Sequence, residues 1–199
     1  MRGYTYKATD EIRTSEAVWG SPLRDVGKAT TLTFMDLMEV RFIDAFRQHG
    51  VGWKTIRIAA QHASELFDRT YPFSTKQFKT DGRTIFAEVG AQTKNQQLID
   101  LARNQYAFHQ VLSRDLYLGL EFAERDEVRR WWPLGTRRRV VVDPQRAFGQ
   151  PIVNREGVPT AVLSAAYKTE KSISRVASWY EVEPLAVRDA LAFEEKIAA

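Results

Sequence analysis

The chain has 199 residues, with 29 Lys plus Arg, 25 Asp plus Glu and no cysteine, so its formal net charge is +4. Its length and composition fit one globular domain or two small ones, and the lack of cysteine excludes disulfide scaffolds, thiolate metal sites and cysteine nucleophiles. Because the sequence has neither an apolar run long enough to span a membrane nor the apolar core of a signal peptide, we expect a cytoplasmic protein without a membrane partner.

The first strong helical signal follows a polar stretch, residues 4–31, that favours extended structure and loops. Thr33 can cap a helix together with Asp36, and Gly50 can adopt the left-handed conformation that ends one. Apolar residues cover far more than one stripe of this helix, so it is either buried on most sides or shared with a second copy of the chain. The candidate partner or dimer contacts on it are Phe34, Met38 and Phe42.

A second helix is expected from Trp53 to about Phe67, because its apolar residues recur at helical spacing. The short link before it makes the two helices an α-hairpin or a helix-turn-helix. Residues 78–86 then place an Asp-Gly pair between two β-prone runs, and this pair favours a type I′ turn. We therefore predict a β-hairpin at residues 78–86.

The middle of the chain predicts one helix and two strands. Helical spacing returns over residues 95–112, and alternating apolar residues over 116–122 predict a half-buried strand. A further strand is expected over residues 138–142. Between these strands, Trp131 and Trp132 would be core residues if they pack between the two halves of the chain, and partner or dimer contacts if they are exposed.

The last forty residues predict three short helices. The first covers about residues 160–169, Ser172 caps the second, and Pro184 occupies a favoured first position of the third. Together they form a helix-turn-helix-like unit. Acidic residues along the last helix, Asp189 among them, would oppose DNA, so a protein-binding or dimerising role is better supported.

Three segments are expected as domains, namely residues 1–90, 91–135 and 136–199, with net charges of +2, 0 and +2. No segment is strongly basic, so none is an obvious footprint for DNA. Three consecutive arginines open the last segment, and they fit a solvated strand end about as well as a phosphate-contacting patch.

No pattern in the sequence indicates an enzyme. The three histidines are scattered, and none has a second histidine or a carboxylate at ligand spacing. The sequence also lacks a phosphate-binding glycine loop and a nucleophile elbow. We therefore expect no catalytic residue, no metal and no cofactor.

Several stretches resemble parts of one protein family. Residues 31–57, with Leu32-Thr33-Phe34-Met35-Asp36 and Gly50-Val51-Gly52-Trp53, resemble the second helix pair of MerR-like winged-helix proteins, and residues 2–6 look like the wing before it. Residues 142–160, with Val142-Asp143-Pro144, Phe148-Gly149-Gln150-Pro151 and Gly157-Val158-Pro159-Thr160, resemble a small domain common in bacterial antitoxins. These stretches, together with residues 71–83 and Trp132-Pro133, follow one another along the chain in an order similar to that in VapB-type antitoxins of the MerR-like kind.

The resemblance implies a mainly α fold with small β hairpins, in which a MerR-like winged-helix remnant precedes a three-helix helix-turn-helix-like domain. It implies the antitoxin of a type II toxin–antitoxin system, a homodimer that neutralises a PIN-like ribonuclease toxin and represses its own operon. In the family a DNA-reading helix-turn-helix precedes the wing, whereas this chain starts at the wing. We therefore expect a truncated form whose binding to operator DNA is weak or absent.

The alternative is a stand-alone MerR-like transcriptional regulator without a toxin partner. In either case the plausible nucleic-acid contacts are basic and aromatic side chains of the wing, the second helix and the arginine run. They are Arg2, Tyr4, Tyr6, Lys7, Lys54, Arg57, Arg137, Arg138 and Arg139.

Overall fold

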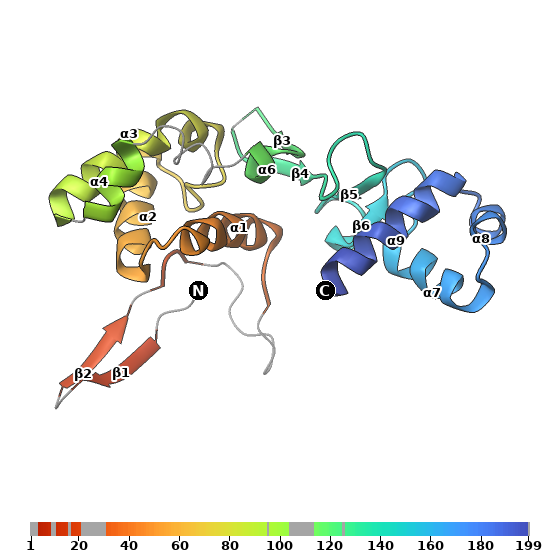
Figure 1. Ribbon diagram of the computed structural model, residues 1–199, viewed down its shortest axis with the longest axis horizontal. Helices are drawn as coiled ribbons and strands as arrows, with labels where there is room; N and C mark the ends of the chain where they lie inside the picture. The colour runs from red at the N-terminus through yellow and green to blue at the C-terminus, as the bar shows by residue number, and fades with distance from the viewer. Residues whose placement is uncertain are drawn as a thin grey trace. The chain divides into compact units, whose positions relative to one another are not determined.

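The chain forms two compact units in a computed structural model (Figure 1). Unit 1 comprises Met1–Leu116 with Glu124–Glu127, and unit 2 comprises Tyr117–Ala123 with Val128–Ala199. The described part is mainly helical with small antiparallel β elements, so the expected mainly α fold is confirmed at that level. The structure describes residues 4–8, 11–15, 17–20, 31–94, 96–103, 114–124 and 126–198.

Unit 1 contains a β-hairpin and a set of helices (Figure 1). The hairpin pairs β1 with β2 in antiparallel register. The element α6 ends at the boundary with unit 2. The bounds are β1 (Tyr4–Ala8), β2 (Glu11–Ser15), α1 (Phe34–Gln48), α2 (Trp53–Phe67), α3 (Lys76–Thr93), α4 (Gln96–Arg103) and α6 (Arg114–Tyr117).

The two predicted helices α1 and α2 are confirmed with nearly the expected ends. The Thr33 hydroxyl accepts the Asp36 backbone N–H at 3.0 Å, and the Asp36 carboxylate accepts the Thr33 backbone N–H at 2.8 Å. This reciprocal cap fixes the first turn. Gly50 has a φ of +81°, the conformation that favours glycine after a helix.

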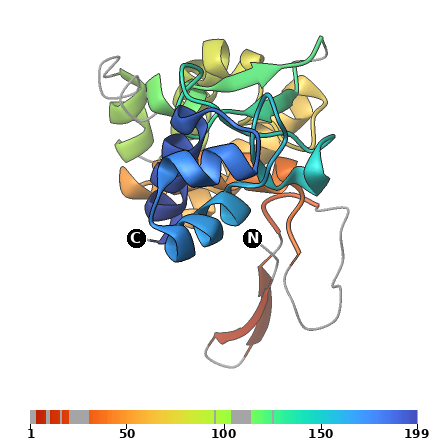
Figure 2. The same ribbon diagram turned by 90° about the vertical axis from the view of Figure 1, so that its right-hand side faces the viewer.

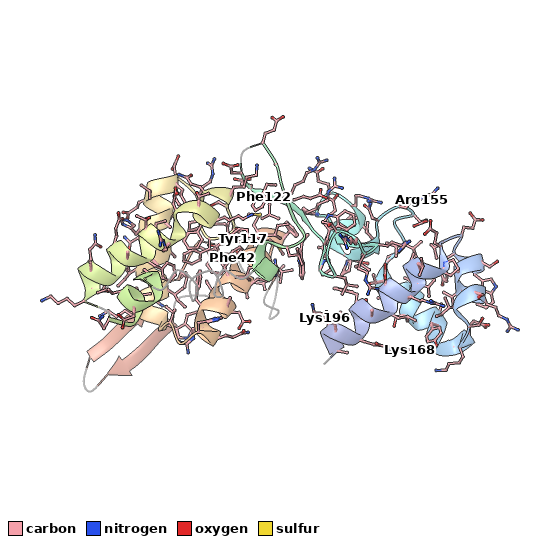
Figure 3. The ribbon with its side chains drawn as sticks, turned by 45° about the horizontal axis from the view of Figure 1, so that its top comes forward. Phe42, Tyr117, Phe122, Arg155, Lys168 and Lys196 are labelled. Carbon is pink, nitrogen blue, oxygen red and sulfur yellow. The ribbon has the colours of Figure 1, made fainter. Side chains whose placement is uncertain are left out.

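The core of unit 1 explains why α1 is so apolar. Phe42 and Phe46 are fully buried within unit 1, and Phe42 is labelled among its helices in Figure 3. The Phe46 ring lies 5.1 Å from that of Phe73 and 5.0 Å from that of Phe86, in edge-on or tilted arrangements. Aromatic rings packed in this way stabilise a core beyond the effect of burial alone. Burial inside the chain thus accounts for these apolar residues of α1, and sharing of the helix with a second copy stays a prediction.

The β-hairpin predicted at residues 78–86 is wrong, because these residues form the middle of α3. Phe78, Ile85 and Phe86 are buried on one side of the helix and join the aromatic core. A Cβ atom on Gly82 would lie 3.0 Å from the Phe78 ring, so glycine here leaves room for that ring. Tertiary packing has overridden the local preference of Asp-Gly for a turn.

Unit 2 combines a four-stranded antiparallel sheet with three helices (Figure 2). The strand order is β3-β4-β5-β6, and α7 and α9 contact β6, while α9 also contacts β5. Val153, Leu163 and Val187 belong to the core between them. The bounds are β3 (Leu120–Phe122), β4 (Val128–Trp131), β5 (Val140–Val142), the 3-10 turn η1 (Ala147–Gly149), β6 (Pro151–Val153), α7 (Thr160–Glu170), α8 (Ile173–Trp179) and α9 (Pro184–Ala198).

The three C-terminal helices are confirmed, and the middle of the chain is confirmed in part. Ser172 caps α8 and Pro184 opens α9, as expected. The strand predicted over residues 116–122 is wrong in its first half, because α6 runs to Tyr117; the Tyr117 ring then stacks on Phe122, 6.4 Å away (Figure 3). Helix α4 confirms the start of the helix expected over 95–112, whose remainder lies outside the described residues.

A buried carboxylate joins α1 to the start of α3. The Glu39 side chain is almost fully buried and accepts the backbone N–H groups of Phe73 at 2.9 Å and Ser74 at 3.0 Å. Burial raises the pKa of Glu39 from 4.5 to about 7, although these hydrogen bonds partly counteract the shift. The carboxyl group therefore changes its charge near neutral pH.

We predict that Glu39 makes the free energy of unfolding depend on pH. Its pKa is higher in the folded than in the unfolded chain, so its contribution is complete below about pH 4.5 and is lost as the pH rises through about 7. The loss should be about 3 kcal/mol at most. Urea unfolding at about pH 5 and about pH 8 measures it. Glu39→Gln cannot titrate and should show a smaller difference; an equal difference in both proteins would contradict the prediction.

Candidate functional site

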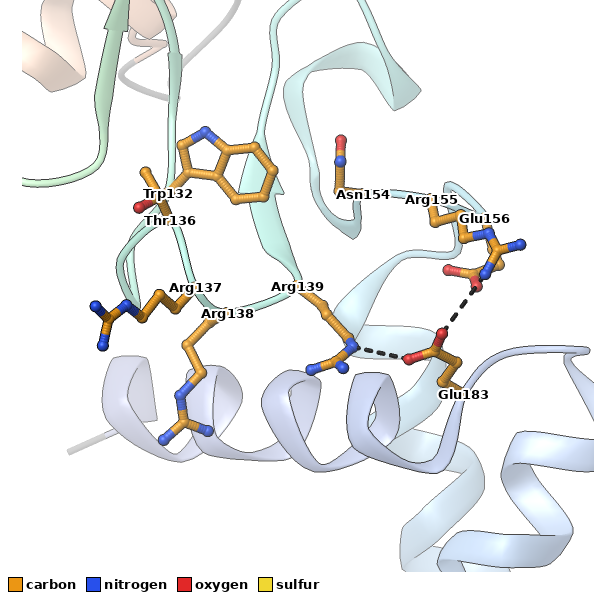
Figure 4. Close-up of a pocket in the computed structure, with 9 residues that line it drawn as sticks. All are labelled: Trp132, Thr136, Arg137, Arg138, Arg139, Asn154, Arg155, Glu156 and Glu183. Carbon is orange, nitrogen blue, oxygen red and sulfur yellow. Dashed lines mark hydrogen bonds and ion pairs between the residues drawn. The ribbon is translucent and has the colours of Figure 1, made fainter.

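The arginine run predicted as a candidate site lies between β4 and β5 in the sequence. It lines a pocket in unit 2 (Figure 4). The cavity has a volume of about 350 Å³. We call it the arginine pocket, because four of its lining residues are arginines. The lining residues are Trp132, Thr136, Arg137, Arg138, Arg139, Asn154, Arg155, Glu156 and Glu183.

Asp189 on α9 positions two of these arginines. It is 2% exposed, and its carboxylate accepts hydrogen bonds from Arg138 Nη1 at 2.7 Å and from the Arg139 backbone N–H at 3.0 Å. Arg139 Nη1 lies 3.5 Å from the same carboxylate. A buried charge is tolerated when it is paired and hydrogen-bonded in this way. Because it is buried and paired, Asp189 does not contribute the repulsion of DNA that was expected of the acidic residues along the last helix.

A second carboxylate, that of Glu183, contacts two arginines of the pocket. Glu183 accepts from Arg139 Nε at 3.1 Å, and its other oxygen lies 3.5 Å from Arg155 Nη1 (Figure 4). The Glu183 side chain is 48% exposed and that of Arg155 is 81% exposed, so water screens this pair. Arg155 extends away from the body of unit 2 (Figure 3).

The residues that line the pocket carry a net positive charge. Its four arginines face the carboxylates of Glu156, Glu183 and the buried Asp189. Within the described part of the chain, Arg137 has no hydrogen-bond or ion-pair partner. Arg137 is thus the pocket arginine most available to a ligand, and Arg155 is highly exposed and held only by its screened contact with Glu183. Such an arrangement can bind an anionic group, whether a carboxylate or a phosphate.

Trp132 closes the inner wall of the pocket. Its side chain is 9% exposed, it packs with Val141 and Ile152, and its indole N–H donates to Glu121 at 2.7 Å. Of the alternatives for this tryptophan, core packing is the one observed. Trp131 is half-buried in β4, opposite Leu120 and Val142.

The remaining predicted site residues lie in unit 1. Met38 and Phe42 are fully buried in the core, so neither offers a surface to a partner in this conformation, whereas Phe34 is half-buried. Lys54 is exposed on α2, and Arg57 on the same helix is half-buried. Arg2 and the side chains of Tyr4, Tyr6 and Lys7 lie outside the described residues. The candidate nucleic-acid contacts are thus divided between the two units.

Glu183 and Asn154 line the pocket although neither was predicted as a site residue, and Asp189 was expected on the surface of the last helix. A signal for Asp189 was present, because it lies between Val187 and Ala190 on the apolar side of α9, where an acid is expected only with a partner. Across the described ranges, no group of three His, Asp or Glu residues could hold a metal ion. No helix in the described part is long and apolar enough to cross a membrane.

We predict that Asp189→Asn lowers the free energy of unfolding of unit 2 by about 2 kcal/mol, because it leaves the guanidinium groups of Arg138 and Arg139 without their buried counter-charge. Urea unfolding measures the change. Glu183→Gln is the matched control: this carboxylate also contacts arginine but is half exposed, so its loss should cost less than about 1 kcal/mol. Equal changes in the two variants would argue against the assigned role of Asp189.

Comparisons with known proteins place these features in context. Residues 140–193 match the family model described as a protein of unknown function, DUF433. They include β5, β6, α7, α8 and most of α9. The chain is 26% identical over 190 residues to "Putative antitoxin VapB45" of Mycobacterium tuberculosis, covering 88% of this chain and 78% of that protein. The crystal structure of Rv2018 from Mycobacterium tuberculosis matches with a TM-score of 0.70 at 23% identity, covering 87% of this chain and 85% of that one. The chain is thus similar to an antitoxin over most of its length and shares the fold of a solved protein.

Proposed function

We propose that this chain is the antitoxin of a type II toxin–antitoxin system. In this proposal it neutralises a PIN-like ribonuclease toxin by protein–protein contact and regulates its own operon through DNA. The observation that carries the proposal is the similarity to an antitoxin over 88% of the chain. The match of residues 140–193 to a family model adds that this part of unit 2 recurs in other proteins.

The electrostatics of unit 2 support a protein contact. Nucleases commonly hold divalent metal ions with a cluster of carboxylates, and arginine side chains can pair with such carboxylates. The arginine pocket offers Arg137 and Arg155 to solvent, while Asp189 and Glu183 hold the neighbouring guanidinium groups in place. Complementary charges of this kind favour fast and specific association.

Unit 1 supports the DNA-binding part of the proposal. The β1–β2 hairpin precedes α1 and α2 in the chain, which is the order expected of a wing in the family that the sequence resembles, and Lys54 is exposed at the start of α2. We assign to this region the MerR-like winged-helix character and the backbone contacts to operator DNA. The homodimer stays a prediction, and its contacts would have to involve side chains other than Met38 and Phe42.

We expect co-expression of this chain to rescue cells from the toxicity of the protein encoded by the neighbouring gene. Growth should return to the level of cells without that protein, and the two proteins should copurify. Leu163→Asp is a suitable control, because a charge in the apolar core should unfold unit 2 and weaken the rescue. Neither complex nor rescue with the unchanged chain would refute the proposal. Operator binding that persists without any protein partner would favour the stand-alone regulator.

A contact of Lys54 with a DNA phosphate should appear as a change in salt dependence. Lys54→Ala should reduce the slope of log Kd against log salt concentration by about 1 for DNA from the chain's own operon, and by a similar amount for unrelated DNA. Lys168→Ala removes the same charge from an exposed position on α7 and serves as the control. If both variants change the slope equally, Lys54 makes no specific phosphate contact.

A further inference from the structure

The link between β5 and β6 presents one phenylalanine entirely to solvent. The relative exposure of Phe148 is 103%, which means that the fold covers none of its ring. The other exposed large apolar residues of the described chain reach 62% at most, at Trp179. Burying a phenylalanine is among the most favourable contributions a side chain can make to stability. Its full exposure therefore gives this fold no stability.

The backbone under Phe148 is held in an unfavourable conformation. Ala147, Phe148 and Gly149 have φ values of +46°, +55° and +75°, all in the left-handed region that residues other than glycine avoid. Hydrogen bonds fix this turn: the Gly149 N–H donates to the Arg146 carbonyl at 2.9 Å, and the Gln150 N–H donates to the Ala147 carbonyl at 3.0 Å. Strain of this kind persists where the surroundings determine the conformation, and it is concentrated at functional sites.

Two contacts attach the strained turn to the wall of the arginine pocket. Arg146 donates to the Asn154 side-chain oxygen at 2.9 Å and to the Asn154 backbone carbonyl at 2.6 Å. Ala147, next to Phe148, packs on the cluster that contains Trp132. The turn that presents Phe148 is thus attached to Asn154, which lines the pocket next to Arg155, and to the apolar cluster of Trp132, which lines it too.

We propose that Phe148, together with Arg137 and Arg155, is the docking anchor through which unit 2 binds an acidic protein surface. The ring enters an apolar pocket of that partner, and the two arginines pair with carboxylates around it. Rigidly held aromatic side chains and arginines dominate the energetics of protein interfaces. This inference rests on the proposed function, because the partner it names is the toxin.

The surroundings favour a protein over a nucleic acid as the occupant. Glu156 and Glu183 line the same pocket and interrupt its positive charge, so it is not the continuous basic surface that a phosphate backbone favours. Asp189 neutralises part of the charge of Arg138 and Arg139 from inside the fold. Proteins that bind single strands align several aromatic rings in a basic groove, whereas here one ring stands beside mixed charges.

The test measures the affinity of the full-length chain for the protein encoded by the neighbouring gene, by titration calorimetry. Phe148→Ala should weaken binding by at least about 30-fold, as expected for a central interface residue. The matched control is Trp179→Ala, which removes an exposed aromatic ring from α8 and should change Kd by less than about threefold. The melting temperature should not fall in Phe148→Ala, because the ring makes no contribution to the core.

The outcomes separate this inference from the proposed function. If the unchanged chain binds the toxin and Phe148→Ala binds it equally well, the inference is overturned and the proposed function stands. If the unchanged chain does not bind the toxin, both fail. If light scattering shows that Phe148→Ala converts a dimer to a monomer with toxin affinity unchanged, the occupant is a second copy of the chain. A selective loss of DNA affinity would assign the ring to nucleic acid and would likewise overturn the inference.

Discussion

The buried carboxylate of Asp189 determines the surface chemistry of unit 2. Removing this charge from water is unfavourable, and the guanidinium of Arg138 and the backbone N–H of Arg139 compensate for it. These bonds attach the segment before β5 to α9, and they fix the floor of the arginine pocket. Because Asp189 engages two arginines in this way, the arginines that it leaves to a ligand are Arg137 and Arg155, the latter held only by its exposed contact with Glu183. A structural requirement thus decides which charges can serve binding.

Unit 1 uses buried acids for the same architectural purpose but with different partners. Asp36 accepts hydrogen bonds from the Trp19 indole N–H and the Tyr71 hydroxyl, and Glu39 accepts two backbone N–H groups from the turn before α3. In both units a helix provides a carboxylate that orders a link distant in sequence. Neutral donors stabilise a charge less than guanidinium does, which is why burial raises the pKa of Glu39 toward neutrality.

Local sequence signals predicted the helices whose ends depend on neighbouring residues. They failed where contacts between residues distant in sequence determine the structure. The caps at Thr33 and Ser172 act within three residues, so sequence alone located α1 and α8. The Asp-Gly pair inside α3 is an equally strong local signal, but the aromatic core formed with Phe46 outweighs it. Of the candidate site, the arginine run was visible in the sequence. Its partner Asp189 lies about fifty residues away, and periodicity alone gave no means of pairing them.

The turn at Phe148 and the arginines held by Asp189 are both ordered before any partner binds. An interface formed by mobile side chains must fix their rotamers on association, and that loss of entropy weakens binding. Here the folded chain has already fixed the backbone at Phe148 through Arg146 and Asn154. The unfavourable φ angles lower the stability of the free protein and the exposed ring adds none, whereas a partner that covers the ring gains the favourable burial without further ordering of the backbone. This balance makes the turn better suited to recognition than to maintaining the fold.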